Sequence, residues 1–266
     1  MSFPLLPKSI GFEMHGEVAV LHLDRTEKRN ALDLTIVHGL RDFFARLDSR
    51  TIKAVVIAGR GDHFCAGLDL SELKETSAEE GLRHSLQHHK AFHEVQFAEV
   101  PVVSVLHGAV VGAGLELASA THIRVAERSA YYGLPEGRRG IFLGGGGSVR
   151  LSRLIGVSRV TDMMMTGRTL DAQEGYQFGV SQYLVDTGAG LEKGLAVARA
   201  AASNASLSNF AMIQALPRIV EMSPEEGLFT ESLMVGLAQG SDDAKARLRA
   251  FLEGRAAKVT RPGEAG

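Results

Sequence analysis

Hydrophobic positions along this chain follow two alternating patterns. Short runs rich in valine and other apolar residues occur at 18–24, 53–59, 101–108 and 122–128. Runs of this length are typical of strands covered on both faces of a sheet. Between the first two runs, residues 32–48 place their apolar side chains at helical spacing. Strand and helix patterns that alternate in this way predict the α/β class.

The pattern changes near residue 145, and helical periodicity dominates from there to residue 255. We therefore expect the first two thirds of the chain to build the sheet. The predicted organisation is a core domain over 1–195 and a helical region over 196–256 that packs against a neighbouring subunit. Residues 257–266 carry no apolar pattern and are expected to form a mobile tail.

Composition narrows the class of protein. The chain has 266 residues, enough for one large core, and its formal net charge is −2. This near-neutral balance predicts a soluble protein and argues against nucleic-acid binding. The longest apolar stretch is interrupted by His107, glycines and Glu116, so no membrane span is expected. The single cysteine, Cys65, and a start without an export signal favour the cytoplasm.

The segment "FCAGLDL" at 64–70 follows the second predicted strand. Gly67 tolerates a backbone geometry that other residues resist, and this can turn the Ala66 amide toward a ligand. The alternative is an ordinary strand-to-helix turn in which Asp69 caps the helix.

The segment "HGAVVGAGLELA" at 107–118 places glycines where a strand ends and a helix begins. Amides of the first helical turn, including that of Ala113, have no acceptor within the helix, and the helix dipole adds positive charge there. If the amides of Ala66 and Ala113 converge, they can stabilise a carbonyl oxyanion. Glu116 would then lie near that carbonyl, or it would only complement the dipole.

Glu136 is the expected partner of Glu116. It follows Pro135 in an irregular, glycine-rich segment after a short apolar run. Two carboxylates around one water can divide the work, one taking a proton while the other gives one. The alternative is a surface glutamate paired with Arg138 or Arg139.

Two other clusters do not indicate a site of their own. The glycines at 144–147 lack both the Walker lysine and a nucleophile elbow, so a tight turn that brings the backbone near a substrate explains them. Histidines at 84, 88, 89 and 93 form i,i+4 pairs without a third metal ligand. A partly solvated helix near a pocket is favoured there, and no metal is expected.

Four ordered segments together resemble the enoyl-CoA hydratase/isomerase (crotonase) family, from about residue 16 to residue 255. They are "RTEKRNAL" at 25–32, "AGRGDHFCAGLDL" at 58–70, "HGAVVGAGLELA" at 107–118 and "YGLPEGRRGIFLGGGGSVRL" at 132–151. The resemblance implies a spiral of ββα units. It also implies a helical C-terminal region that forms homotrimers, often paired into hexamers.

The resemblance further implies a coenzyme A thioester as substrate and no separate cofactor. Its carbonyl would be held by the amides of Ala66 and Ala113. Glu116 and Glu136 match the two catalytic glutamates of the hydratase branch, with the same separation of 136 − 116 = 20 residues. The positions that match substrate and coenzyme A contacts are Lys28, Arg29, Ala31, Ala66, Gly67, Leu68, Asp69, Leu70, Gly112 and Gly144.

Both glutamates are present, which favours an enoyl-CoA hydratase, a hydro-lyase of fatty acid metabolism. The alternatives are a double-bond isomerase, another acyl-CoA lyase or hydrolase of the family, and a non-catalytic crotonase-like binding protein. The chain departs from the family pattern at Leu68, His107, Ala113 and Leu143, and Gly254 stands where a lysine often meets coenzyme A phosphates.

Overall fold

The computed structural model describes residues 6–69, 71 and 77–255. The chain divides into two compact units, Met1–Ala202 and Ser203–Gly266. All strands of the described residues lie in the first unit, and the second is helical. Leu70, an expected substrate contact, and the tail over 257–266 lie outside the described residues.

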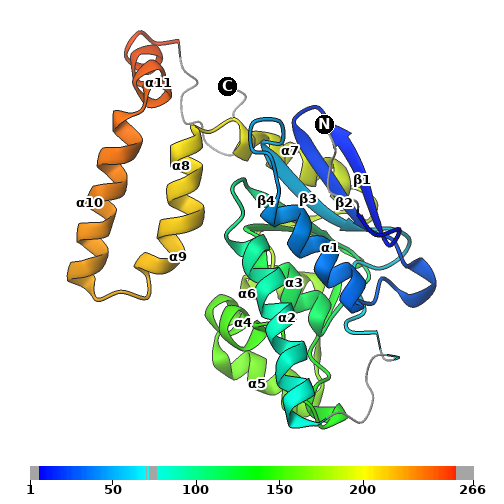
Figure 1. Cartoon of the computed structure of the whole chain (residues 1–266). Helices are drawn as coiled ribbons and strands as arrows, with labels where there is room; N and C mark the ends of the chain where they lie inside the picture. Colours follow the sequence, from blue (N-terminus) through cyan, green and yellow to red (C-terminus); the bar gives the residue numbers. More distant parts are fainter. Residues whose placement is uncertain (1–5, 70, 72–76, 256–266) are drawn as a thin grey trace. The chain divides into compact units, whose positions relative to one another are not determined.

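A six-stranded sheet forms the centre of the first unit (Figure 1). The first two strands in sheet order pair antiparallel, and the remaining neighbours are parallel. In that order the strands are β1 (Ile10–His15), β2 (Val18–Leu23), β3 (Ala54–Gly59), β4 (Val102–Leu106), β6 (Ile123–Glu127) and β9 (Tyr183–Val185).

The four apolar runs of the sequence coincide with β2, β3, β4 and β6, so these strand predictions are confirmed. The expectation that only the first two thirds of the chain builds the sheet is wrong, because β9 pairs with β6. At three residues, β9 is too short to show a strand pattern of its own.

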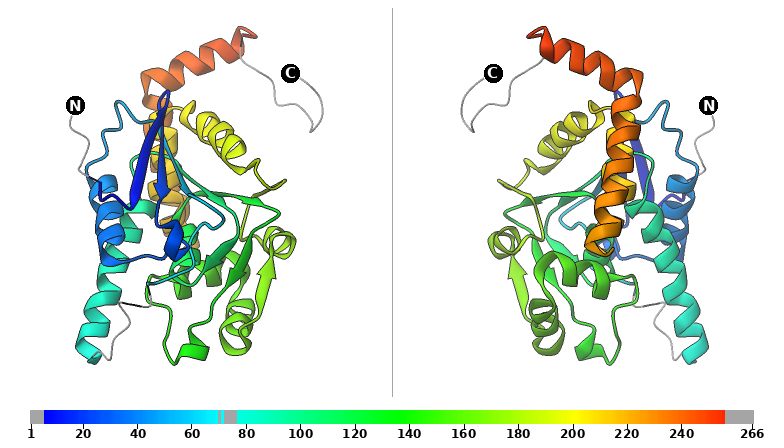
Figure 2. Two further views of the ribbon diagram at one scale, coloured as in Figure 1. Left: turned by 90° about the vertical axis from the view of Figure 1, so that its right-hand side faces the viewer. Right: turned by 90° about the vertical axis from the view of Figure 1, so that its left-hand side faces the viewer.

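Helices cover both faces of this sheet, as Figure 2 shows. On one face lie α1 (Leu34–Ala45), α2 (Ala78–Gln96) and α3 (Ala113–Ala120), which share the larger buried apolar cluster. On the other face α7 (Gly190–Ala202) packs Leu195 and Ala198 against valines of the strands. This packing places α7 in the first unit, so the boundary falls after Ala202 rather than after residue 195.

A second, three-stranded sheet positions the site. It consists of β5 (Ala109–Val111), β7 (Tyr131–Gly133) and β8 (Thr169–Asp171). β5 and β7 are parallel, with Val111 beside Gly133. The chain continues from β5 into α3 and from β7 toward Glu136, so both segments leave the sheet at the same end.

The remaining helices confirm the helical character predicted beyond residue 145. In the first unit they are α4 (Gly147–Ile155), α5 (Val157–Thr166) and α6 (Ala172–Phe178). In the second unit they are α8 (Ser206–Phe210), the π-helical turn Ala211–Ala215, α9 (Leu216–Ile219), α10 (Pro224–Gly240) and α11 (Asp242–Leu252). Within the described residues, no helix combines the length and the apolar character needed to cross a membrane.

Candidate active site

Glu116 and Glu136 line the same cavity, whose volume is about 600 Å³. Glu116 lies on α3 and Glu136 on the segment after β7, and the pairing of β5 with β7 brings these segments together. The two residues are 3% and 7% exposed, respectively. The structure therefore places both acids singled out from the sequence in one site, where both are buried.

The Glu116 carboxylate is held by backbone amides of the glycine run. Its Oε1 atom accepts hydrogen bonds from the N–H groups of Gly145 and Gly147, each at 2.8 Å. A Cβ atom at Gly147 would lie 2.8 Å from Glu116 Cγ, so a side chain there would displace the carboxylate. Burial raises the pKa of Glu116, and the amide hydrogen bonds oppose this rise. The glycine run thus binds the acid itself, which the interpretation as a turn near substrate did not foresee.

The Glu136 carboxyl is less well satisfied. Its Oε2 atom is buried and has no hydrogen-bond partner among the described residues. Burial raises the pKa of Glu136 to about 7, and the nearby Glu116 carboxylate adds to the rise while Arg139 opposes it. The alternative of an exposed, salt-bridged glutamate is wrong, because the side chain is buried and Arg138 donates instead to the Thr166 carbonyl.

The amide of Ala66 is not available to a ligand. Its N–H donates to the carbonyl oxygen of Arg29 at 3.0 Å, so the prediction that Ala66 supplies a donor is wrong. The next candidate along the loop is Leu68. Gly67 O accepts from Leu32 N–H, and Asp69 N–H donates to Leu32 O, so the Leu68 N–H between them points to the opposite side.

Leu68 and Ala113 form the pair of free amides. Neither N–H has an acceptor among the described residues, and both residues line the carboxylate cavity. The two segments lie side by side, since a Cβ atom at Gly67 would be 3.9 Å from Ala113 N. Gly67 has a φ of +108°, a conformation that other residues rarely adopt. Two such amides beside two acids can hold a carbonyl oxygen on which negative charge develops.

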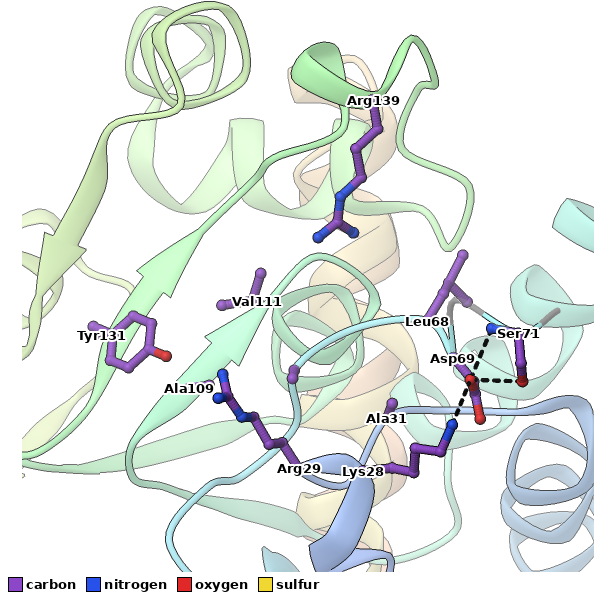
Figure 3. Close-up of a pocket in the computed structure, with 11 residues that line it drawn as sticks. Lys28, Arg29, Ala31, Leu68, Asp69, Ser71, Ala109, Val111, Tyr131 and Arg139 are labelled. Carbon is purple, nitrogen blue, oxygen red and sulfur yellow. Dashed lines mark hydrogen bonds and ion pairs between the residues drawn. The ribbon is translucent and has the colours of Figure 1, made fainter. Parts of the chain in front are cut away.

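A second cavity of about 410 Å³ adjoins the first and is shown in Figure 3. Arg139 reaches toward it from one side, and Lys28 and Arg29 approach from the other. Three cationic side chains around one cavity suit anionic groups such as phosphates. The residues that line both cavities are Ala66, Leu68, Val111 and Arg139.

The other expected contact residues also lie at these cavities. Lys28, Arg29, Ala31 and Asp69 line the smaller one, and Gly67, Gly112 and Gly144 line the larger one. Asp69 is buried, and its carboxylate stabilises the loop that contains it. It accepts hydrogen bonds from the amide and hydroxyl of Ser71 and from Arg25, and these bonds hold its pKa well below the usual range.

Sequence reasoning missed three contributors to the site: the Leu68 amide, the amides of Gly145 and Gly147, and Arg139. Any residue type can supply a backbone N–H, so the sequence does not indicate which amide is a donor. The hydrogen bonds of the neighbouring residues in the structure show which N–H remains free. Arg139 was considered only as a surface partner of Glu136. No group of three or more histidine, cysteine, aspartate or glutamate side chains in the described part of the chain could hold a metal ion.

Comparisons with known proteins agree with this geometry. A family model described as enoyl-CoA hydratase/isomerase matches residues 13–261. The chain is 30% identical to the short-chain-enoyl-CoA hydratase of Clostridium acetobutylicum, over 91% of this chain and 94% of the relative. A crystal structure of a candidate enoyl-CoA hydratase from Rhodopseudomonas palustris is 53% identical, with a TM-score of 0.90 over 94% of this chain and 97% of that one. An enoyl-CoA hydratase structure from Bacillus anthracis is 28% identical, with a TM-score of 0.88 over 93% and 97% of the two chains.

Proposed function

Because the chain belongs to the enoyl-CoA hydratase/isomerase family, we propose that it adds water reversibly across the C2–C3 double bond of a 2-enoyl-CoA. One observation carries this proposal. Two buried carboxyl groups, those of Glu116 and Glu136, line a single cavity beside two backbone amides that have no acceptor in the part of the chain that the structure describes. An acid and a base at one site are the groups that hydration of a double bond requires.

The proposed oxyanion donors are the N–H groups of Leu68 and Ala113. When water adds to C3 of the substrate, negative charge moves onto the thioester oxygen and forms an enolate. Donors fixed in advance stabilise this charge without having to reorient, and each is typically worth about 3 kcal/mol. Leu68 takes the place that the sequence interpretation assigned to Ala66, whose amide is bonded to Arg29.

Glu116 is the proposed base and Glu136 the proposed acid. The amides of Gly145 and Gly147 occupy Oε1 of Glu116 and favour its charged form, which leaves Oε2 to accept a proton from water. The pKa of Glu136, raised to about 7, keeps a protonated fraction available at neutral pH to protonate C2. The water oxygen bonds to C3 as a hydroxyl group, and the proton of Glu136 is transferred to C2. Transfer of a proton from Glu116 to Glu136 then restores the starting state.

The coenzyme A part of the substrate is proposed to occupy the smaller cavity. Its phosphate groups can form ion pairs with Lys28, Arg29 and Arg139. The residues that line both cavities would contact the part of the substrate between the phosphates and the thioester, which lies near the two acids. No cofactor beyond the coenzyme A of the substrate enters this proposal.

Loss of the enoyl absorbance of crotonyl-CoA and of longer, branched and aromatic enoyl-CoAs tests the reaction with purified protein. We expect turnover, and we expect Glu136→Gln to lower kcat by about 100-fold or more with little change in KM. Glu17→Gln, at an exposed position of the first unit, is the matched control. No turnover of any substrate refutes the proposal, and conversion of a 3-enoyl-CoA alone would make the protein an isomerase.

We also propose that the second unit joins copies of the chain into a trimer. Its described helices expose many large apolar side chains, which is typical of an interface. They include Leu228, Phe229, Leu233, Leu237, Leu248, Phe251 and Leu252. Light scattering after size-exclusion chromatography is expected to give the mass of three chains or of six, and a stable monomer contradicts this.

A further inference from the structure

Arg150, in the first turn of α4, lies against the glycine run that holds Glu116. Its Nη1 atom donates a hydrogen bond to Gly145 O at 2.8 Å. Its Nε atom donates at 2.7 Å to Oε1 of Gln96, the last residue of α2. A Cβ atom at Gly146 would collide with the guanidinium group. The side chain is half-buried and lines neither cavity, so it ties the glycine run to α2 without reaching a substrate.

The carbonyl that Arg150 binds belongs to the backbone that binds the proposed base. Gly145 O lies along the chain between the N–H groups of Gly145 and Gly147, which donate to Glu116 Oε1. Glycine has the most backbone freedom to lose, so a glycine run does not hold one geometry without bonds from outside. Ser85 supplies one such bond, from its hydroxyl to Gly144 O at 2.7 Å. Arg150 supplies the bond nearest the two amides.

Arg150 also places positive charge near a buried acid. Burial raises the pKa of Glu116, and the amides of Gly147 and Gly145 and the charge of Arg150 oppose this rise. The interaction is mutual, because Glu116 opposes the fall that burial causes in the pKa of Arg150. A guanidinium group stays protonated at any ordinary pH, so its charge on the carboxylate is constant.

The other ionisable side chains around Glu116 do not take over this role. Glu136 repels a charged Glu116, and Arg139 acts on the pKa of Glu136. Burial lowers the pKa of His88 to about 4, so this ring is neutral at pH 7. The ionisable residues that line the cavity together with Glu116 are Glu80, Arg83, His84, His88, Glu136 and Arg139.

We propose that Arg150 is a positioning residue for the base of the reaction, which keeps the two glycine amides directed at Glu116 and stabilises its ionised carboxylate. This inference rests on the proposed hydratase function and adds a residue to it. A merely structural arginine would join α2 to α4 and contribute to stability. It would not change the pH at which Glu116 takes up a proton.

The pH profile of kcat/KM separates these two roles. Glu116 must be ionised to accept a proton from water, so activity falls on the acidic side as it becomes protonated. Arg150→Met removes the cation and is expected to move this acidic limb to higher pH by about half a unit or more. At the optimum we expect kcat to fall about tenfold with little change in KM, because Arg150 lines neither cavity.

Three further variants separate charge from hydrogen bonding. Arg150→Lys keeps the charge but not the two-pronged donor, so we expect the acidic limb of the wild type with a kcat reduced about threefold or more. Arg150→Gln removes the charge and keeps an amide donor, and it serves if the methionine variant does not fold. Arg153→Met changes an exposed arginine of the same helix by the same charge, and we expect no shift.

Infrared difference spectra over a pH series follow the carboxyl groups directly and need no turnover. The signal that disappears in Glu116→Gln assigns the group. We expect its protonation midpoint to rise in Arg150→Met and Arg150→Gln and to stay near the wild-type value in Arg150→Lys. The midpoint therefore tests the action of Arg150 on Glu116 even if the reaction is a different one.

The outcomes distinguish this inference from the hydratase proposal. An unchanged midpoint in both neutral variants overturns it, as does a loss of kcat/KM that is uniform across pH. An equal shift in Arg153→Met also overturns it, because the effect would then come from net charge alone. A shifted midpoint in a protein that hydrates no enoyl-CoA would support the action of Arg150 on Glu116 and refute hydration alone.

Discussion

Replacing Glu136 with glutamine is expected to stabilise the folded protein at high pH. The carboxyl is buried, its Oε2 atom has no hydrogen-bond partner in the described part of the chain, and burial raises its pKa to about 7 from an ordinary value of 4.5. In the unfolded chain the same group is solvated and ionises near the ordinary value. Between these two pH values the unfolded state gives up its proton and the folded state keeps it. The wild type therefore loses stability as the pH rises through this window.

The size of the effect follows from the difference of 7 − 4.5 = 2.5 pKa units. At about 1.36 kcal/mol per unit, the full loss is roughly 3 kcal/mol, reached above pH 7. Part of this loss has already occurred at pH 5, so about 2 kcal/mol remains between pH 5 and pH 8. Glutamine has a similar shape and cannot ionise, so the free energy of unfolding of the variant does not fall over this pH range.

Urea denaturation of the wild type and Glu136→Gln at about pH 5 and pH 8 measures the effect. The free energy of unfolding of the variant, relative to the wild type, is expected to increase by about 2 kcal/mol between the two pH values. The exposed control Glu17→Gln is expected to show no such increase. A difference for Glu136→Gln that is independent of pH would mean that this group ionises in the folded protein as easily as in water. The proposed acid would then lack its physical basis.

Three further predictions follow from the same geometry. The kcat/KM for hydration is expected to fall about tenfold per pH unit above pH 7, as Glu136 loses the proton it donates, and a flat profile to pH 9 contradicts this. Gly147→Ala puts a Cβ atom 2.8 Å from Glu116 Cγ and is expected to lower kcat about tenfold or more, and a steady-state kcat equal to that of the wild type contradicts this. Asn30→Ala removes three hydrogen bonds between a buried side-chain amide and the backbone and is expected to cost about 3 kcal/mol of unfolding free energy, and a thermal or urea midpoint equal to that of the wild type would show that these bonds contribute nothing.

Four of the five strands with five or six residues were predictable because their apolar pattern is local, whereas β1, which is only partly buried, was missed. β2 is buried along its whole length and β3 along nearly all of it, and such burial favours a nearly continuous apolar sequence. The strands β5, β7, β8 and β9 have only three residues each, which is too few for a pattern to stand out. These short strands form only because a partner segment is already in place.

The catalytic side chains of the proposed site could be predicted from the sequence, but the backbone amides that act with them could not. Glu116 and Glu136 could be selected because acids are unusual in apolar or glycine-rich segments, and the family match agrees with the motifs that contain them. The choice of Ala66 was wrong by two residues. The direction of each N–H in that loop depends on its pairing with Leu32 and Arg29, which are distant in sequence.

The sequence by itself determined the α/β class, the helical C-terminal part, the family and the identity of the two acids. These properties depend on side-chain type and local periodicity, which can be read along the chain. Only the tertiary structure decided which amides stay unpaired within the described ranges, which glycines hold Glu116, and how strongly burial raises the pKa of Glu136. Hydrogen-bond direction and desolvation are set by groups that meet only when remote segments fold together.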